Sequence, residues 1–477
     1  MGDTQNRIHT ASMRMLGETG IALPGGKIQG LLRENGVRVE NGRAFFSEGD
    51  LMHWVGKSPP SFKVYARNPN HDMDIGNGSR EFAPGFGAPQ IVDYNGNRRL
   101  ATFKDYMNFV KMVQNCPLFK VNGGLLVQPS DLTQDGYFAA MLYAALVNSD
   151  KCLIGGAGGA RESEIVMDML KIAFGEADLC GKPRIFGIVN TSSPMGISGK
   201  SLETIEAFAK NKQPLIFTPG PICGMTGPVT LAGHLAMANA EALAAIAIAQ
   251  MFNEGAPVVY GVQGSGSDMR TASPCPGSAD SAKIVAHSAR MAKFYNLPCR
   301  SGGAKNDAKA VDVQSGYESM MMLLTSCIEG IDLMVHSAGI LDSILSMSYE
   351  KFVVDTEIIG MVKHWLEGIG TDEESLAVDV VKEGVAAGEF ITSDHTLRNY
   401  KAAGFYPDIS LRGVLPENET PGSAIARNID AKIDELLKAR GQGAAPLETR
   451  DSLLCYIRQA GINIDTGAVA DAIAADL

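Results

Sequence analysis

Four polar side chains that could contact a small substrate follow apolar, strand-like runs of the sequence. Histidine can move a proton near neutral pH, and asparagine and glutamine can both donate and accept hydrogen bonds. A lysine amine can pair with an anion or form a Schiff base. These residues are Asn190, Gln263, Lys305 and His336. Each has a structural alternative, because a hydrogen-bonded histidine or a solvated lysine needs no ligand.

Several aromatic residues stand near the same loop ends or in the first turns of predicted helices. An aromatic face attracts a quaternary ammonium group by about 0.5–2 kcal/mol, so these rings could contact a cationic ligand. Packing in the core is the alternative for each of them. They are Phe86, Tyr94, Tyr106, Tyr317 and Tyr349. The mixed-charge loop around Lys305, which also holds Asp307, Lys309 and Asp312, is either solvated or part of a binding rim.

These residues belong to a repeating pattern in which an apolar run ends in a loop rich in glycine, proline or amides and a helical segment follows. Eight such runs alternate with seven helical segments, which is the count that a closed (β/α)8 TIM-type barrel needs. The predicted strands are residues 82–86, 119–122, 152–154, 184–189, 214–217, 257–262, 297–301 and 331–335. A doubly wound open sheet is the alternative fold, although it usually has fewer strands.

Alternation along each strand predicts which side chains point into the barrel. Leu333 and Val335 suit the face that the outer helices cover, so their neighbours would face inward. The residues predicted to point inward are Gly261, Gln263, Asp332, Met334 and His336. His336 and Gln263 would then lie at the carboxyl end of the barrel, where active sites of this fold are found.

Three regions are expected along the chain. Residues 1–75 form an N-terminal α/β extension, residues 76–355 the barrel, and residues 356–477 a C-terminal helical cap or oligomerisation region. The fold class is therefore α/β, with additions at both ends of the barrel.

Common phosphate and metal motifs do not fit. The glycine-rich run at 155–160, GGAGGA, would need a further glycine where Arg161 stands to match a dinucleotide loop, so a tight turn is favoured. Neither a phosphate-loop motif nor a nucleophile elbow occurs, and the eight histidines lack metal-site spacing. We therefore expect no metal site.

Composition limits the function classes. The net charge of −11 argues against nucleic-acid binding, which needs a basic patch, and is compatible with a small cationic ligand. The eight cysteines are scattered, so we expect reduced thiols in a cytoplasmic protein. The N-terminus lacks the apolar core of a signal peptide, and we expect neither secretion nor membrane insertion.

Five segments together resemble the trimethylamine:corrinoid methyltransferase superfamily. They are HSAGILDSILSMSYEKFVVD at 336–355, DVQSGYE at 312–318, FAPGFGAPQ at 82–90, GEFITSDHTL at 388–397 and the helix around Arg427. The resemblance covers nearly the whole chain. It implies a (β/α)8 barrel that moves a methyl group from an amine to the cobalt of a corrinoid protein.

One departure narrows the expected substrate. Archaeal trimethylamine enzymes of this superfamily carry pyrrolysine in the barrel, and this sequence has none. It resembles the branch that demethylates quaternary amines, with glycine betaine the first expectation, followed by proline betaine, carnitine and γ-butyrobetaine. A quaternary ammonium leaves as a neutral amine without a general acid, so orientation and water exclusion could suffice.

The resemblance also sets the expected cofactor and partner. We expect no tightly bound cofactor, because the chain would act on the cobalamin-type corrinoid of a cognate partner protein, and we expect a homo-oligomer. His336 and Gln263 would hold the substrate carboxylate, and the aromatic rings the ammonium group. The alternatives are a barrel lyase or aldolase that uses a lysine such as Lys305, and a betaine-binding barrel without turnover.

Overall fold

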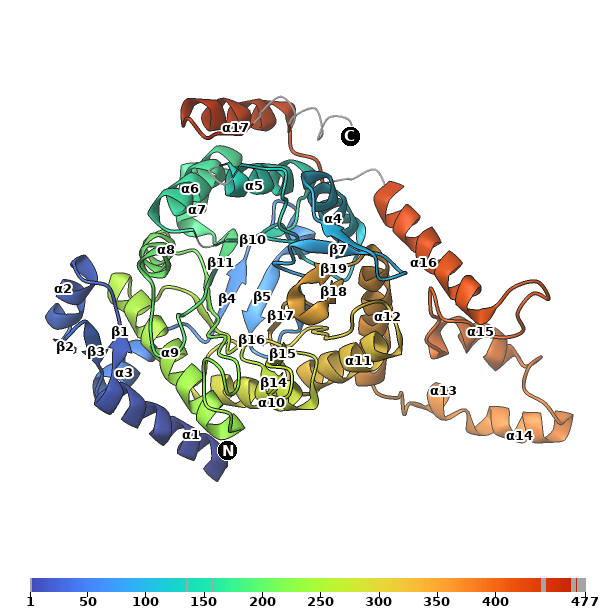
Figure 1. The fold of residues 1–477 in the computed structure, drawn as a ribbon. Coiled ribbons are helices and arrows are strands. Elements are labelled where there is room, and N and C mark those ends of the chain that lie inside the picture. The colour runs from blue at the N-terminus through green and yellow to red at the C-terminus, as the bar shows by residue number, and fades with distance from the viewer. Residues whose placement is uncertain (1, 134–135, 157, 439–442, 465–468, 470–477) are drawn as a thin grey trace.

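The chain forms a closed barrel of eight parallel strands inside a ring of helices (Figure 1). The computed structural model describes residues 2–133, 136–156, 158–438, 443–464 and 469. The barrel strands are β6 (Glu81–Phe82), β9 (Val121–Asn122), β10 (Cys152–Gly155), β11 (Ile185–Val189), β12 (Leu215–Phe217), β13 (Val258–Tyr260), β16 (Arg300–Ser301) and β17 (Leu333–Met334). Each lies within or beside one of the eight predicted runs, and the predicted fold class is confirmed.

Two parallel sheets and two single bridges close the ring. Strands β9 to β13 pair in chain order, and β16 pairs with β17, which pairs with β6. The bridge Phe82–Phe119 joins the first strand to the second, and Tyr260–Cys299 joins the sixth to the seventh. Because all eight strands are parallel, their carboxyl ends meet at one mouth.

In the described residues, eight helices cover the barrel: seven lie between the barrel strands, as predicted, and one follows the eighth strand. They are α4 (Phe103–Asn115), α5 (Tyr137–Asn148), α6 (Ala160–Phe174), α8 (Gly199–Lys210), α9 (Leu231–Phe252), α10 (Ala279–Phe294), α11 (Val313–Ile328) and α12 (Tyr349–Leu366), with the short α7 (Glu176–Gly181) after α6. The last of them, α12, begins at Tyr349 behind the N-cap Ser348, whose hydroxyl accepts from the Lys351 amide. It completes the eighth strand–helix unit.

A hairpin from the N-terminal extension fills the amino end of the barrel. Strands β4 (Ser61–Val64) and β5 (Met73–Gly76) are drawn at the centre of the ring in Figure 1, and their apolar side chains share a cluster with alternate residues of the barrel strands. The Cys152 thiol donates to the Val64 carbonyl at 3.4 Å, at the start of β10. The hairpin therefore closes the end opposite the mouth.

The prediction of which side chains of the last strand face the barrel interior is wrong at Leu333, Met334 and Val335. Leu333 and Val335 belong to the interior cluster, whereas Met334 packs outward, with its sulfur 3.6 Å from that of Cys327. The prediction assumed that apolar residues face the helices, but this part of the interior is apolar as well. His336 still turns inward because its φ of +65° interrupts the alternation of the strand.

The N-terminal extension packs on α9. It comprises α1 (Asp3–Arg14), a π-helical turn (Met15–Thr19), α2 (Lys27–Glu34), α3 (Glu48–Val55) and a small sheet of β1 (Ile21–Ala22), β2 (Arg38–Glu40) and β3 (Arg43–Phe45). A turn at Asn41–Gly42 joins β2 to β3, with positive φ at both residues. By length and composition α9 could cross a membrane, but 89% of its most apolar window is buried inside the structure.

Short strands lie in the loops at the mouth of the barrel, and further helices come after the barrel in the chain. The mouth strands are β7 (Gln90–Val92), β8 (Arg98–Leu100), β14 (Gly266–Asp268), β15 (Ser273–Cys275), β18 (Ile340–Leu341) and β19 (Ser346–Met347). The C-terminal helices are α13 (Glu373–Leu376), α14 (Val378–Ala387), α15 (Asp394–Ala403), α16 (Pro421–Lys438) and α17 (Leu447–Gln459). Helix α16 packs on α4 and α12, α17 packs on α6, and α13 and α14 project from the barrel (Figure 1).

Candidate active site at the carboxyl end of the barrel

A buried arginine that sequence reasoning did not select lies at the centre of the site. Arg300 is on β16, in register with the inward-facing Leu333, and is almost fully buried. Its Nη1 donates to Oε1 of Gln263, and its Nε has no partner in the described structure. Gly261 lies beside it, because a Cβ added there would be 3.3 Å from Arg300 Cδ and 2.8 Å from the Phe217 carbonyl oxygen.

Backbone contacts bring Lys305 next to His336. The Ala304 amide donates to the His336 carbonyl at 2.7 Å, and the His336 amide donates to Pro84 at 3.1 Å. Gly303 permits this approach, since a Cβ there would lie 2.1 Å from the Val335 carbonyl oxygen. The loops after the first, seventh and eighth strands therefore meet at the mouth.

The pKa values of the two side chains reflect this burial. Burial, followed by the charge of Arg300, lowers the pKa of Lys305 to about 7. Burial also lowers the pKa of His336 well below its usual value, and the charges of Arg300 and Lys305 lower it further. His336 is therefore neutral at physiological pH.

The site contains four buried polar atoms without a hydrogen-bond partner. They are Gln263 Nε2, Arg300 Nε, Lys305 Nζ and His336 Nδ1, four of the nine such side-chain atoms in the described structure. We call these four residues the cationic cluster. A buried cation without a counter-charge costs several kcal/mol, and an anion that accepts hydrogen bonds from it removes that cost. The arrangement therefore suits a small carboxylate.

Phe86 borders the cationic cluster. Its ring meets that of His336 edge to face, with centroids 6.4 Å apart, and it packs against the interior apolar cluster. Among the predicted aromatic residues, it is the one that the structure groups with His336. Its face can contact an ammonium group, while the cluster contacts an anion.

Asn190 lies at the mouth on a loop that a buried glutamate holds. Asn190 is exposed, and its side-chain oxygen accepts a hydrogen bond from the Thr218 hydroxyl. Glu241, on α9 and fully buried, accepts from the Thr191 and Ser193 hydroxyls and from the Met195 amide at 2.7 Å. Sequence reasoning missed both Glu241 and Arg300, although a charged residue inside an apolar run was a usable signal.

The other predicted aromatic residues do not join the cluster. Tyr349 stacks on Phe109 with centroids 4.5 Å apart, and its hydroxyl donates to Asp105 at 2.8 Å, between α4 and α12. Tyr106 is buried with its hydroxyl on a carbonyl of α5. Tyr94 and Tyr317 are exposed, the first in the turn between β7 and β8 and the second on α11.

The glycine-rich turn after β10 is occupied by protein groups. The Gly159 amide donates to the Thr204 hydroxyl at 3.2 Å, and the Ala160 amide donates to the Glu203 carboxylate at 3.0 Å. These bonds satisfy the first amides of α6, where a phosphate would bind; Ala157 lies outside the described residues. Within the described chain, no group of three histidine, cysteine or acidic side chains could hold a metal ion.

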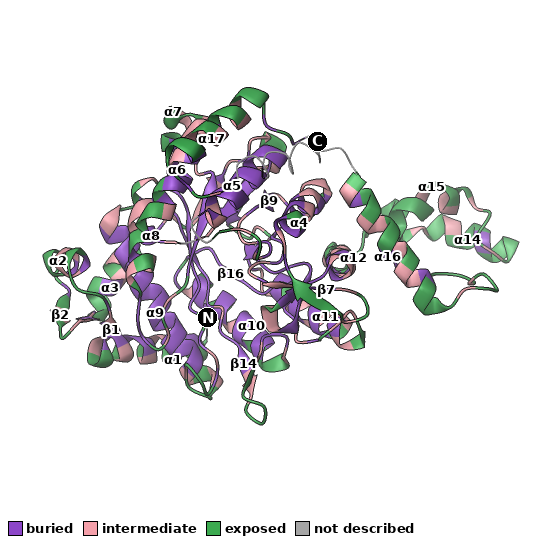
Figure 2. Cartoon of the chain, turned by 45° about the horizontal axis from the view of Figure 1, so that its top comes forward, coloured by how far each residue is buried: buried purple, intermediate pink, exposed green. Residues whose placement is uncertain are grey.

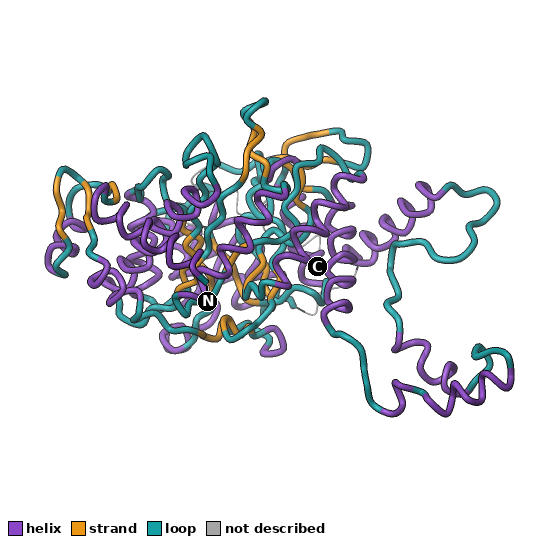
Figure 3. Tube along the Cα trace, turned by 90° about the horizontal axis from the view of Figure 1, so that it is seen from below, coloured by secondary structure: helices purple, strands orange, loops and turns teal. Residues whose placement is uncertain are grey.

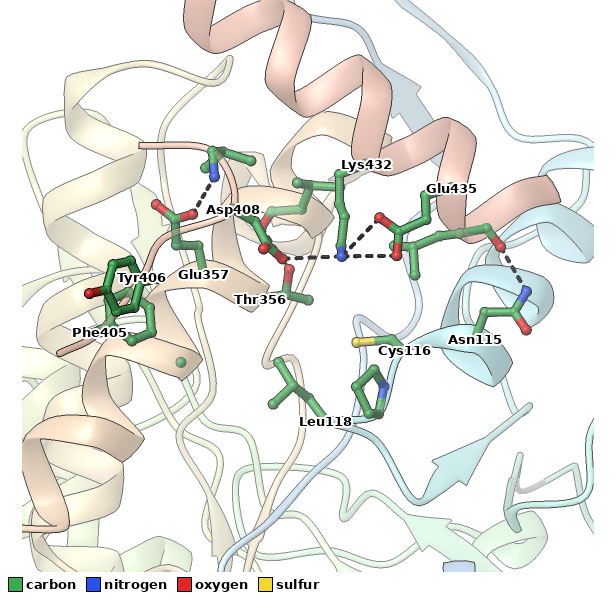
Figure 4. Close-up of a pocket in the computed structure, with 15 residues that line it drawn as sticks. Asn115, Cys116, Leu118, Thr356, Glu357, Phe405, Tyr406, Asp408, Lys432 and Glu435 are labelled. Atoms are coloured by element: carbon green, nitrogen blue, oxygen red, sulfur yellow. Dashed lines mark hydrogen bonds and ion pairs between the residues drawn. The ribbon is translucent and has the colours of Figure 1, made fainter. Parts of the chain in front are cut away.

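A cavity of about 320 Å³ lies outside the barrel wall, between α4, α12 and α16 (Figure 4). It is lined by charged residues of both signs together with neutral polar and apolar residues, and none of its lining residues belongs to the cationic cluster. Its position at the root of the C-terminal helices associates it with that region and separates it from the mouth.

Comparisons with known proteins identify relatives of this chain. The family model for trimethylamine methyltransferase (MTTB) matches residues 2–460. The glycine betaine methyltransferase of Desulfitobacterium hafniense (strain Y51) is 36% identical over 461 residues, covering 92% of this chain and 96% of that protein. The trimethylamine methyltransferase MttB of Desulfitobacterium hafniense (strain DSM 10664 / DCB-2) is 31% identical over 399 residues, 82% of this chain and 79% of the relative.

A solved structure supports the fold alone. The crystal structure of the hydroxylamine MtmB complex aligns with a TM-score of 0.52 and 11% identity, covering 91% of this chain and 86% of that one. Such low identity carries no information about the substrate. The match of the family model along almost the entire sequence does establish kinship, and the chain belongs to the trimethylamine methyltransferase (MTTB) family.

Proposed function

We propose that the chain transfers a methyl group from a quaternary amine that carries a carboxylate, with glycine betaine the first choice, to the Co(I) corrinoid of a partner protein. The cationic cluster carries this proposal. Trimethylamine has no carboxylate and would leave Arg300 and Lys305 without a counter-charge, whereas a betaine supplies one. A relative named for glycine betaine, similar over nearly the full length, supports the same choice.

The proposed roles follow from the contacts. Arg300 and Lys305 hold the carboxylate, and Gln263 orients the guanidinium through its side-chain oxygen. The neutral imidazole of His336 and the ring of Phe86 line the path of the ammonium group toward the mouth. Anchoring the substrate at its carboxylate would direct an N-methyl group outward, where a corrinoid can approach.

The chemistry balances without an acid from the protein. The electron pair of Co(I) forms the bond to the methyl carbon, and the carbon–nitrogen pair leaves with nitrogen as a neutral tertiary amine. Cobalt ends as methyl-Co(III), so no proton is transferred. The chain contributes placement and charge, consistent with a site whose histidine stays neutral.

The test follows conversion of Co(I) to methyl-Co(III) by absorbance with purified protein and reduced corrinoid partner. Glycine betaine, proline betaine, carnitine, γ-butyrobetaine, trimethylamine and choline form the panel. Choline is the matched control, because it keeps the trimethylammonium group and replaces the carboxylate with a hydroxyl. Transfer from betaines and little from choline is expected; equal rates with choline or trimethylamine would contradict the role of the cluster.

Lys305 also supports a second candidate function. An unpaired, buried amine with a pKa near 7 is suited to forming a Schiff base with a carbonyl substrate, as in a barrel lyase or aldolase. Borohydride in the presence of small keto acids would then leave a covalent adduct on Lys305. Absence of an adduct, together with methyl transfer from a betaine, would exclude this function.

A further inference from the structure

Three consecutive residues that are not glycine adopt left-handed backbone conformations in the loop after the eighth barrel strand. The φ angles of Asp342, Ser343 and Ile344 are +53°, +54° and +77°. Residues other than glycine rarely adopt this conformation, and a β-branched residue such as isoleucine is especially unsuited to it. The described chain contains no other run of three such residues. We call this segment the left-handed turn, and its surroundings must compensate for its strain.

The left-handed turn is bonded to the loop between β16 and α11, which carries Lys305 and which we call the Lys305 loop. The Asp342 amide donates to the Ala308 carbonyl at 2.9 Å. The Ser343 amide donates to the Asn306 carbonyl, also at 2.9 Å. A turn conformation directs successive N–H groups to one side of the chain. The left-handed conformation therefore lets two neighbouring amides reach the same loop.

Lys305 lies between two of the backbone bonds that tie its loop to the segment after the eighth strand. On one side, the Ala304 amide donates to the His336 carbonyl at 2.7 Å. On the other side, the Asn306 carbonyl accepts from the amide of Ser343. Because both neighbours of Lys305 are held, the direction in which its side chain leaves the backbone follows from these two bonds.

Two carboxylates fasten the left-handed turn through side chains. Asp342 is buried and contacts Arg98 at 2.7 Å, and it also pairs with Lys309 of the Lys305 loop. The Ser343 hydroxyl donates to Asp307 of the same loop at 2.8 Å. Hydrogen bonds to charged groups are stronger than those between neutral groups. These contacts can therefore offset the strain of the turn and hold it against the Lys305 loop.

The left-handed turn joins β18 to β19 at the mouth of the barrel. Figure 3 shows short strands and loops at the top of the molecule, on the side of the mouth. Buried residues predominate in the barrel and on the inner faces of its helices, as Figure 2 shows. Lys305 is fully buried as well, and its amine has no hydrogen-bond partner in the described structure. The turn therefore links the rim of the mouth to a buried amine.

We propose that Asp342 and Ser343 are positioning residues, which act through the left-handed turn to hold the amine of Lys305 where it meets the substrate carboxylate. The proposal rests on the proposed function for the carboxylate, whereas the hold on Lys305 follows from the contacts alone. A lysine amine sits on a flexible four-carbon stem, so its backbone must be fixed if the amine is to meet a small anion. Strain in the turn is the consequence of holding the Lys305 loop.

The experiment labels lysine amines of the full chain with acetic anhydride and quantifies each modified peptide by mass spectrometry. Asp342→Asn with Ser343→Ala removes the side-chain contacts of the turn, while asparagine keeps the tolerance for positive φ. We expect acetylation of Lys305 to rise by about tenfold or more, because the freed loop opens more often. Acetylation of Lys151 and Lys351, which are also buried, should stay unchanged and shows that the rest of the fold is intact.

Kinetics with the reduced corrinoid partner give the second measurement. The double variant should raise KM for glycine betaine by roughly tenfold and change kcat by less than about twofold, because the carboxylate is bound in the ground state and in the transition state alike. The matched control is Asp268→Asn, which removes a carboxylate–arginine pair from the β14–β15 hairpin at the same mouth. Both the KM and the acetylation of Lys305 should stay at the wild-type values in this control.

Three results would overturn the proposal. They are unchanged acetylation of Lys305, a rise that Lys151 and Lys351 share, and an unchanged KM despite a rise at Lys305. A double variant that has lost the circular dichroism of the barrel is replaced by Ser343→Ala alone, for which the same expectations hold. If no betaine donates a methyl group to the corrinoid and the turn still controls acetylation of Lys305, the proposed function fails while the hold on Lys305 stands.

Discussion

The side chain of Arg300 donates to Gln263 through one nitrogen while its Nε has no partner, although both residues lie at the buried mouth of the barrel. An arginine anchored at one point presents its remaining donors in a fixed direction. Lys305 Nζ and His336 Nδ1 are two further nitrogens without a hydrogen-bond partner. Both side chains are close enough to Arg300 for its charge to lower their pKa values. The site is thus complementary to an anion before any ligand binds.

Replacing Arg300 tests that complementarity. Arg300→Gln should raise KM for glycine betaine by roughly 30- to 100-fold, or about 2–3 kcal/mol, because the carboxylate loses a charged donor in a desolvated site. Activity on choline, if measurable, should change little. Arg300→Lys keeps the charge and should recover part of the loss. An unchanged KM for glycine betaine in Arg300→Gln would show that Arg300 does not hold the substrate carboxylate.

The pKa of Lys305 predicts opposite effects of pH on stability and on binding. In the folded protein it is about 7, below the usual value of about 10.4 in an unfolded chain. Below pH 7 the folded state bears the full cost of an unpaired ammonium, which is relieved as pH rises. The free energy of unfolding without ligand should therefore increase between about pH 7 and about pH 10.

Binding should follow the opposite trend. A carboxylate needs the protonated amine, so affinity for glycine betaine should fall as pH rises above 7, with proton uptake on binding that calorimetry detects in two buffers. Lys305→Met should flatten both profiles. If the affinity of the Lys305→Met variant for glycine betaine kept the wild-type dependence on pH, a group other than Lys305 would cause that dependence.

Sequence patterns predicted the barrel well and the contents of its mouth only in part. Each strand could be found because its apolar run ends in a loop of glycine, proline or amide residues. The inward direction of the Leu333 side chain could not be predicted, because the β4–β5 hairpin makes the barrel interior apolar around it. Arg300 was missed because its long side chain reaches a residue from the neighbouring strand. The contact of Tyr349 with Asp105 could not be predicted because it depends on the rotation of the helix.

Glu241 should act through the loop that it holds. Glu241→Gln retains one oxygen for three donors, so residues 190–195 should become less ordered and kcat/KM should fall by roughly tenfold, or about 1.4 kcal/mol. If Asn190 is what the loop positions, Asn190→Ala should lower kcat/KM much less in the Glu241→Gln background than in the wild type. Fully additive losses would separate the two residues.

A buried ion pair supports the loop that follows His336. Lys351 contacts Asp355 and donates to the Ser319 hydroxyl at 2.7 Å, while Asp355 accepts from the Gly339 amide at 2.9 Å. Asp355→Asn should lower the free energy of unfolding by about 3–5 kcal/mol, since it leaves a buried ammonium without its counter-charge. The double change Lys351→Met with Asp355→Leu should restore most of that loss in denaturant titrations.

Substitutions of His336 can separate its side chain from its backbone. Its φ of +65° is unfavourable for alanine by about 1–2 kcal/mol, whereas glycine adopts it freely and asparagine tolerates it. If the imidazole borders the substrate, His336→Ala, His336→Gly and His336→Asn should all retain the circular dichroism of the barrel and all slow methyl transfer. The free energy of unfolding, in contrast, should fall most for His336→Ala. Wild-type kinetics in His336→Gly would restrict His336 to supporting the rim, because only the backbone conformation would then matter.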